Sequence, residues 1–339
     1  MGCVGGGTTA RRYTPPHARH HRSGARRPGR SHPRLRRDPP PGARRGARSA
    51  PSDRCQLLRY RAAPRRLRSP ELPWIPGNEA AGVVEGVGAG AEPEWLGRRV
   101  AFWAARTTGT YAEYACVPAA TLFTLVDGVE FPIAAALPAQ GLTAYGLSHA
   151  ATSLAPGQTA LVHAAAGGVG ALLVQLLQSR GVRVFGTASS PAKLAFVHDL
   201  GAVSLPYGAG LPERVRAANG GQGVDAVFDS VGRATQSDSL AVLAPHGHLV
   251  FFGDASGSPV PIHPDELYGR SLKVSSFWLA TDPPERWALA QRELQCWVME
   301  GKLRVTLDQT LPLAEAAEAH RRLEQRRTHG KLVLMPQEP

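Results

Sequence analysis

The sequence predicts an α/β protein with a doubly wound parallel sheet and a separate, smaller β domain. From about residue 131, apolar runs such as TALVHAA, VRVFGTA and HLVFFG alternate with helix-like segments such as GALLVQLLQSRG and PAKLAFVHDLG. Strands that are apolar throughout and are separated by helices are typical of a parallel sheet covered on both faces. Residues 69–130 instead carry short apolar runs between Gly and Pro, which indicate a small β-barrel or sandwich.

Length and composition limit the class of protein. The 339 residues, 43% of them hydrophobic, suffice for two domains of ordinary size. No apolar run is long enough to span a bilayer, and the N-terminus lacks the apolar core of a secretory signal, so we expect a cytoplasmic protein with no membrane partner. The four cysteines are scattered without a CxxC pair, which argues against a disulfide framework or a Cys-rich zinc lobe.

The positive charge of the chain is confined to its first fifth. Residues 1–68 hold 19 Arg and two acids, a net +17, whereas the remaining 20 basic and 25 acidic residues give −5. The segment contains too few apolar side chains to offset chain entropy, so we expect it to be disordered in isolation. A nucleic-acid-binding arm, a transit peptide and a frame error in a GC-rich gene are alternative explanations, of which the frame error is favoured and a nucleic-acid partner is not.

A glycine cluster follows the apolar strand expected at residues 159–164. The stretch AAAGGVG contains Gly167, Gly168 and Gly170 and opens an amphipathic segment. Glycines between a strand and a helix permit a tight turn and a close approach of a pyrophosphate to the helix N-terminus. The match to GxGxxG is imperfect, so a plain strand-to-helix turn remains an alternative.

The next strand favours one type of dinucleotide. A site for NAD usually has an acidic residue at the end of this strand, and GTASSPAK has none. It offers Ser189, Ser190 and Lys193, whose hydroxyls and cation suit a 2′-phosphate. NADPH is therefore preferred to NADH, with a solvated lysine in the first turn of a helix as the alternative for Lys193. Tyr207, at the end of AVSLPY, is a candidate to stack or hydrogen-bond near the same phosphate, with a surface tyrosine as the alternative.

Residues 71–339 resemble the zinc-independent quinone oxidoreductases of the medium-chain dehydrogenase/reductase superfamily, the group that includes zeta-crystallin. The resemblance rests on segments that occur in the family's order: LPWIPGNEAAGVVEGVG, GTYAEYACVPA, AAALPAQGLTAYGL, HAAAGGVG, GTASSPAK, FDSVGR, LVFFGDASG and HGKLVLMP. It implies a Rossmann cofactor domain and a GroES-like catalytic domain that is incomplete at its N-terminus. The expected division is 1–68 without family match, 69–130 partial GroES-like domain, 131–264 Rossmann domain and 265–339 return to the catalytic domain.

The resemblance also implies a set of cofactor-binding residues. Gln140 and Thr143 are placed near the nicotinamide. The pyrophosphate is expected on the glycine loop, and the 2′-phosphate beside Ser189, Lys193 and Tyr207. The complete set is Gln140, Thr143, Gly167, Gly168, Val169, Gly170, Ser189, Lys193, Tyr207, Ser230, Phe252, Gly253, Asp254 and Lys331.

The sequence departs from zinc-dependent relatives. They have His in the segment that here reads PGNEAAG, where Asn78 cannot ligate zinc well, so no metal site is expected. Glu79 is interpreted as a structural carboxylate, and His163, inside a buried strand, as a core histidine rather than a base. The family's first strands have no counterpart in residues 1–68, which leaves the wall facing the nicotinamide incomplete.

The expected function is zinc-independent hydride transfer from NADPH to a quinone or related conjugated carbonyl. No residue is assigned as a general acid, because a conjugated acceptor already spreads the developing charge. The alternatives are an enoyl or alkenal reductase and a non-catalytic NADPH-binding protein. The expected partners are a quinone or enone substrate and a second copy in a homodimer.

Overall fold

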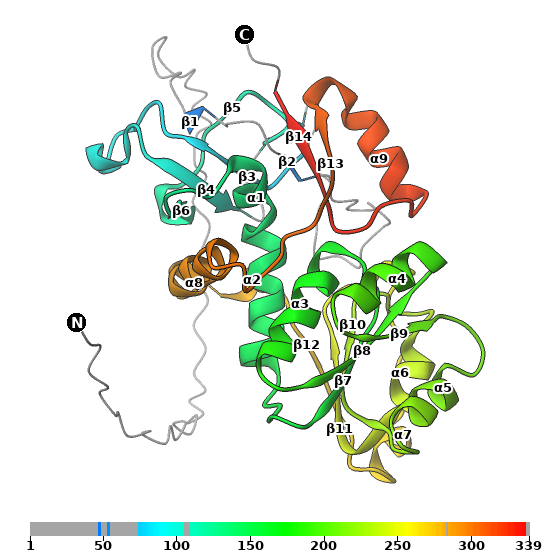
Figure 1. The fold of residues 1–339 in the computed structure, drawn as a ribbon. Coiled ribbons are helices and arrows are strands. Elements are labelled where there is room, and N and C mark those ends of the chain that lie inside the picture. The colour runs from blue at the N-terminus through cyan, green and yellow to red at the C-terminus, as the bar shows by residue number, and fades with distance from the viewer. Residues whose placement is uncertain (1–46, 49–52, 55–73, 105–108, 283, 337–339) are drawn as a thin grey trace, which may run out of the picture. The chain divides into compact units, whose positions relative to one another are not determined.

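The computed structural model describes residues 47–48, 53–54, 74–104, 109–282 and 284–336. They belong to one compact unit, and their strands form two sheets (Figure 1). One sheet has six strands and contains the glycine loop. The other has eight strands and combines early and late parts of the chain.

The six-stranded sheet is parallel throughout and has the order β12-β11-β10-β7-β8-β9. Its strands are β7 (Thr159–Val162), β8 (Arg183–Ala188), β9 (Val203–Pro206), β10 (Val224–Asp229), β11 (Leu243–Phe251) and β12 (Lys273–Ser276). If β7 is numbered as the first strand and the sheet is followed from β9 to β12, the strand order is 3-2-1-4-5-6. This is the order of the doubly wound dinucleotide-binding sheet. The predicted Rossmann fold is thereby confirmed.

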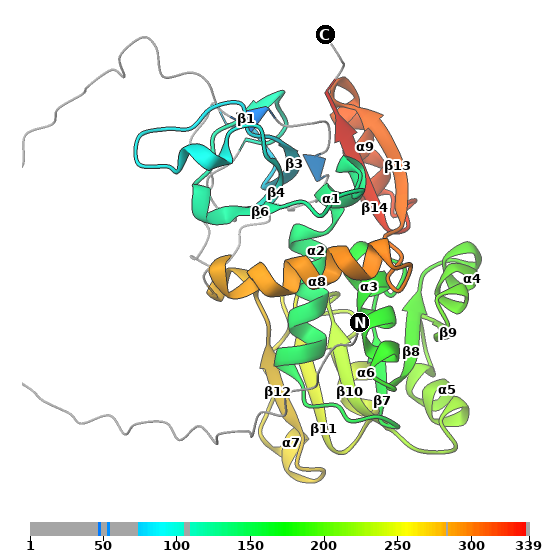
Figure 2. The same cartoon turned by 60° about the vertical axis from the view of Figure 1, so that its left-hand side comes forward.

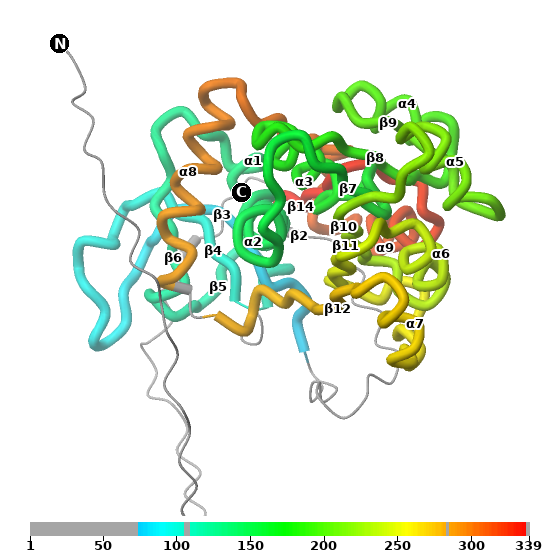
Figure 3. Tube along the Cα trace, turned by 90° about the horizontal axis from the view of Figure 1, so that it is seen from below, coloured from blue at the N-terminus to red at the C-terminus, as the bar shows by residue number. Residues whose placement is uncertain are grey.

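Helices cover both faces of this sheet, as Figure 3 shows with α2 and α3 on one side and α5 and α6 on the other. Adjacent residues of β7 point in opposite directions: Val162 packs with Leu173 of α3, and Leu161 packs with Leu211 of α5. This explains why the strands are apolar along their whole length. The helices are α2 (Pro138–Gly146), α3 (Gly168–Ser179), α4 (Pro191–Asp199), α5 (Leu211–Ala218), α6 (Gln236–Ala241) and α7 (Asp265–Tyr268).

The eight-stranded sheet is assembled from both ends of the chain. It has the order β13-β14-β2-β3-β1-β5, with β4 between β3 and β6. The strands are β1 (Ala47–Arg48), β2 (Asp53–Arg54), β3 (Glu79–Val83), β4 (Arg99–Trp103), β5 (Tyr114–Ala115), β6 (Leu122–Thr124), β13 (Leu307–Pro312) and β14 (Lys331–Met335). β14 pairs in parallel with β13 and antiparallel with β2, so the C-terminal strand is an interior member of the sheet.

Three further helices accompany this sheet: α1 (Phe131–Ala136), α8 (Ala288–Met299) and α9 (Ala316–Glu324). α1 buries three alanines against β3, and α8 lies beside α2 (Figure 2). The remaining turns are 3-10 segments at Pro93–Trp95, Ala119–Thr121, Leu279–Thr281, Pro284–Trp287 and Leu313–Glu315, and a π-helical turn at Leu147–Ala151.

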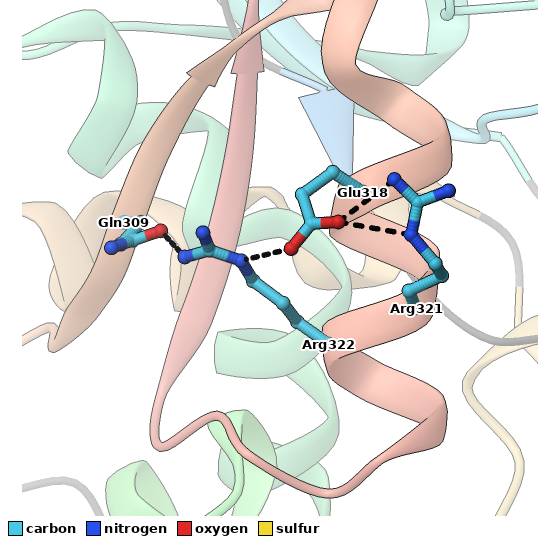
Figure 4. Close-up of polar contacts among 4 residues, drawn as sticks. All are labelled: Gln309, Glu318, Arg321 and Arg322. Carbon is cyan, nitrogen blue, oxygen red and sulfur yellow. Dashed lines mark hydrogen bonds and ion pairs between the residues drawn. The ribbon is translucent and has the colours of Figure 1, made fainter.

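A polar cluster lies along α9 and reaches β13 (Figure 4). The carboxylate of Glu318 accepts hydrogen bonds of 2.8 Å from Arg322 and 2.9 Å from Arg321. These bonds, with that of Arg322 the larger cause, lower the pKa of Glu318. Arg322 also bonds to Gln309 on β13, so its guanidinium links the helix to the strand.

Three strands lie close to or across the domain boundaries expected at residues 68 and 264. β12 begins nine residues after position 264, the expected end of the Rossmann domain, and pairs in parallel with β11. β1 and β2 fall within residues 1–68, where both pair with β3. The rest of that segment lies outside the described residues.

Candidate functional site

The glycine loop lies where the strand order of the parallel sheet reverses. β7 is flanked by β8 and β10, and the helices that follow β7 and β10 cover opposite faces. In open α/β sheets ligands bind at this edge, outside the carboxyl ends of the strands. Ala164 adopts a positive φ of 52°, and Gly167 is the N-cap of α3.

Close packing explains two of the three glycines. A Cβ at position 170 would lie 2.8 Å from Ala165 Cα and closer still to the carbonyl oxygen of Ala164. A Cβ at position 168 would overlap the side-chain amide of Gln140. The structure therefore brings the predicted residues Gln140 and Gly168 into contact.

The residues of this loop fit a negatively charged ligand. The first turn of α3 has no acidic residue, and its first N–H groups have no partner within the helix. Gln140 exposes 9% of its surface, and its side-chain amide lies against Gly168 at the start of α3. An amide that offers both a donor and an acceptor next to a helix N-terminus is suited to a ligand's polar groups.

Lys193 lies at the start of α4, beyond the end of β8. Ser190 caps this helix and accepts a hydrogen bond of 3.4 Å from the Lys193 backbone N–H, while Ser189 is exposed. Lys193 Nζ donates to the Arg326 carbonyl oxygen at 2.8 Å. Burial lowers the pKa of Lys193, Asp308 opposes this shift and Arg326 reinforces it. The backbone of Arg326 therefore lies against Lys193 at the predicted 2′-phosphate side.

Tyr207 lies beneath the glycine loop. Its hydroxyl oxygen accepts a hydrogen bond of 2.6 Å from the Ala164 N–H, and its ring stacks on His163 with centroids 5.9 Å apart. Burial is the main cause that raises the pKa of Tyr207, and Arg326 acts in the opposite direction. Tyr207 and Lys193 are thus both within electrostatic range of Arg326.

The loops after β10 and β11 come together on the other side of the glycine loop. A Cβ on Gly253 would lie 2.9 Å from the Ser230 carbonyl oxygen, so these two predicted residues are in contact. Phe252 packs against the core, and Asp254 is exposed. Thr143 lies one helical turn after Gln140 on α2 and is half-buried.

Lys331, the last residue of the expected cofactor-binding set, begins β14. Its ammonium is buried and forms an ion pair with the buried carboxylate of Glu79 on β3. Glu79 also accepts a 2.7 Å hydrogen bond from the Ala139 N–H at the start of α2. Next to Lys331, the Gly330 N–H donates to the Ala166 carbonyl oxygen at 2.8 Å, and Gly330 bridges Gly167. The C-terminal strand therefore adjoins the glycine loop through its backbone.

Arg326 was not predicted from the sequence. It follows α9 and adopts a positive φ of 55°. Its carbonyl oxygen accepts a hydrogen bond from the ammonium of Lys193, which lies 133 residues earlier in the chain. Two adjacent arginines after a helix are usually solvated, so the sequence offers no local signal for this position. Only the return of the chain along β13 and β14 brings it beside α4.

Other features lie away from this edge. A pocket of about 310 Å³ is lined by Ser153, His246 and Lys273, at the amino ends of the strands, and contains none of the predicted site residues. Among the described residues, no three His, Cys, Asp or Glu side chains are grouped so as to hold a metal ion. No helix in the described part of the chain has the length and apolar composition of a membrane span.

The fold and the loop define a class of protein. A doubly wound parallel sheet with a glycine loop at its switch point, joined to a second sheet built from both ends of the chain, is the architecture of a two-domain dehydrogenase/reductase. Family models agree: an alcohol dehydrogenase GroES-like domain matches residues 50–127, and a zinc-binding dehydrogenase model matches residues 207–334. The first match begins 19 residues before the boundary expected at residue 69.

The chain belongs to the quinone oxidoreductase family. It is 38% identical over 273 residues to a quinone oxidoreductase of Pseudomonas aeruginosa, covering 79% of this chain and 84% of the relative. A mycobacterial structure complexed with NADPH has a TM-score of 0.79 and 35% identity, covering 89% of this chain and 94% of that one. The Escherichia coli quinone oxidoreductase complexed with NADPH has a TM-score of 0.78 and 31% identity, covering 85% and 90%.

Proposed function

We propose that this protein catalyses the zinc-independent reduction of quinones by NADPH. The observation that carries the proposal is the glycine loop with its neighbouring cations: a helix N-terminus free of acids, a buried Gln140 amide beside it, and Lys193 and Arg326 at the end of β8. Membership of the quinone oxidoreductase family and the NADPH-complexed relatives support the same cofactor and acceptor.

The residues of this chain would hold NADPH along the carboxyl edge of the sheet. The backbone of Gly167, Gly168, Val169 and Gly170 would bind the pyrophosphate, because unpaired N–H groups and the helix dipole favour negative charge there. Ser189, Lys193 and, beneath the loop, Tyr207 would form the 2′-phosphate side. The predicted set further comprises Gln140, Thr143, Ser230, Phe252, Gly253, Asp254 and Lys331.

The chemistry requires positioning more than acid–base catalysis. When bound, NADPH supplies a hydride from its nicotinamide, which the acceptor receives. Gln140 at the start of α2 and the Ser230–Gly253 contact would orient the cofactor along the sheet edge, and α3 would fix its phosphates. We assign no general acid and no metal ligand, since a quinone delocalises the charge that it gains.

The purified protein tests this function directly. We expect oxidation of NADPH with ortho- or para-quinones, followed by absorbance, and slower oxidation of NADH. A panel containing quinones, alkenals and enoyl esters separates quinone reduction from enoyl reduction. Turnover of the enones alone would contradict the quinone assignment, and tight NADPH binding without any turnover would identify a non-catalytic binding protein.

We further propose a cytoplasmic homodimer. β12 is one of the two edge strands of the parallel sheet among the described residues, and Trp278 and Tyr268 expose 50% and 75% of their surface close to it in sequence. An unpaired edge with exposed aromatic side chains is suited to pairing with a second copy. The described cysteines, Cys116 and Cys296, are free, as is usual in a reducing compartment. Light scattering of the purified protein tests the oligomeric state.

A further inference from the structure

The pocket at the amino ends of the strands lies at the other end of the parallel sheet from the glycine loop. Its volume is about 310 Å³, and it is lined by residues 151–154 and by parts of β10, β11 and β12. Pockets that bind small molecules typically have volumes of about 300–1,000 Å³. Because the pocket is at the lower end of this range, it suits a ligand much smaller than a dinucleotide.

Three basic side chains line this pocket: His246 and His248 of β11 and Lys273 of β12. His248 and Lys273 are paired residues of neighbouring parallel strands, so their side chains lie on the same face of the sheet. Lys273 is exposed, while His248 is half-buried and its Nε2 lies 2.7 Å from the Ser275 hydroxyl oxygen. The register of two adjacent strands therefore brings an ammonium and an imidazole together at the pocket.

The backbone around His246 is held in an uncommon conformation. His246 has a positive φ of 65°, and its N–H donates to the Arg270 carbonyl oxygen at 2.7 Å. A Cβ on the next residue, Gly247, would lie 2.8 Å from the Ala244 carbonyl oxygen, so the chain is closely packed at this turn. Backbone strain that the surroundings maintain in this way is often found at ligand sites.

Asp225 is the one acidic residue among the described residues that line the pocket. Its carboxylate accepts hydrogen bonds of 2.8 Å and 2.7 Å from the N–H and the hydroxyl of Thr159, and one of 3.0 Å from the Gln158 side-chain amide. These bonds hold the carboxylate against the start of β7. The acceptor sites of Asp225 are therefore largely used within the protein, whereas the basic groups of the pocket are available to a ligand that accepts hydrogen bonds.

A further cation lies behind one wall of the pocket. Arg180 follows α3, and its Nη2 donates to the carbonyl oxygen of the lining residue Leu154 at 3.3 Å. The guanidinium keeps its charge at every pH at which the protein would be studied. Of the charged groups in the lining or in contact with it, Lys273 and Arg180 are thus positive and Asp225 is negative, a balance that favours an anion.

We propose that this pocket binds a small, doubly charged oxyanion of the phosphate type through Lys273 and the imidazoles of His246 and His248. An ammonium and two imidazoles can donate charge-assisted hydrogen bonds to such a group, and the exposed Ser153 adds a hydroxyl to the lining. The site lies at the end of the strands away from the glycine loop. It is therefore a second ligand site, and it does not depend on the proposed reduction of quinones.

Binding of a dianion should be coupled to uptake of a proton. Burial lowers the pKa of His248, and the neighbouring Lys273 adds to this shift, so the ring is neutral at neutral pH in the free protein. A bound dianion stabilises the imidazolium and raises this pKa, so affinity should rise as the pH falls. The other charged or titratable groups around His248 are Asp225 from β10, His246 from its own strand and, behind the wall, Arg180.

Calorimetric titration of the purified protein with sulfate, whose charge is constant between pH 6 and pH 8, tests the site. Lys273→Met should weaken binding about tenfold, because it removes one charge-assisted hydrogen bond. Lys302→Met removes an exposed lysine elsewhere, and Lys193→Met removes a cation at the carboxyl edge of the sheet; both should retain this binding. Sulfate binding that Lys273→Met leaves unchanged would overturn the proposal.

The pH dependence and the choice of anion complete the test. Sulfate should bind at least about threefold more tightly at pH 6 than at pH 8, and His248→Gln should remove most of this difference, since a rise of one unit in the pKa of the ring has an effect of this size. Equal affinities at the two pH values in the wild-type protein would overturn the role of the histidines. Tighter binding of glycerol phosphate than of inorganic phosphate would identify a phosphate ester as the ligand, and equal binding the free ion. Failure of both to bind at pH 6 would refute the site.

Discussion

Removing the ammonium of Lys331 should destabilise the protein strongly. The Lys331 and Glu79 side chains expose 2% and 0% of their surface, and their ion pair joins β14 to β3. Lys331→Met leaves the Glu79 carboxylate buried without its cation, which typically costs about 3–5 kcal/mol of unfolding free energy. The measurement is urea unfolding of the purified variant, followed by circular dichroism.

Two further variants separate the buried charge from the loss of a lysine. In the Glu79→Gln/Lys331→Met double variant neither charge of this pair remains, and an amide oxygen still accepts the Ala139 N–H, so the loss should be smaller than for Lys331→Met alone. Lys302→Met breaks an exposed pair with Glu300, whose two side chains expose 69% and 50%, and should cost less than about 1 kcal/mol. Equal losses for Lys331→Met and Lys302→Met would refute the reasoning.

Three other predictions concern the cofactor site. Lys193→Glu should reverse the preference for NADPH over NADH, measured as the ratio of the two dissociation constants, and an unchanged NADPH value would remove Lys193 from the site. Gly170→Ala should abolish cofactor binding or folding, because its Cβ would collide with the Ala164–Ala165 backbone. Gly157→Ala is the control: its Cβ would meet no atom within 4 Å, and its φ of 87° leaves backbone strain as the only cost, which thermal unfolding measures. Since burial lowers the pKa of Lys193, its ammonium loses its proton at a lower pH than that of an exposed lysine. NADPH affinity should therefore fall as the pH rises toward 10, while NADH affinity stays level. Parallel pH curves for the two cofactors would argue against a contact between Lys193 and the phosphate.

The sequence predicted the parts of the site that depend on local patterns. The strand before Gly167, the amphipathic α3 and the acid-free end of β8 each follow from residues within about a dozen positions, and the sheet has the predicted doubly wound order. His163 was interpreted as a core histidine, and the structure shows it buried with both nitrogens hydrogen-bonded.

Contacts between distant segments could not be predicted in this way. Glu79 and Lys331 are 252 residues apart, and the sequence around neither residue indicates that the two side chains form an ion pair. Arg326 meets Lys193 because β13 and β14 return the chain to α4, which is a property of topology rather than of local composition. The two hydroxyls that face the His163 ring, on Thr187 and Ser239, likewise come from separate elements of the fold.

The backbone bridge between Gly167 and Gly330 has a consequence for the order in which the protein is made. The strand β7 and its loop leave the ribosome when the chain is half complete, but the loop's neighbour on the C-terminal side emerges some 160 residues later. The parallel sheet can therefore form early, whereas the finished edge of the cofactor loop cannot exist until synthesis has reached β14. A nascent or C-terminally clipped chain would carry the glycine sequence without the wall that supports it.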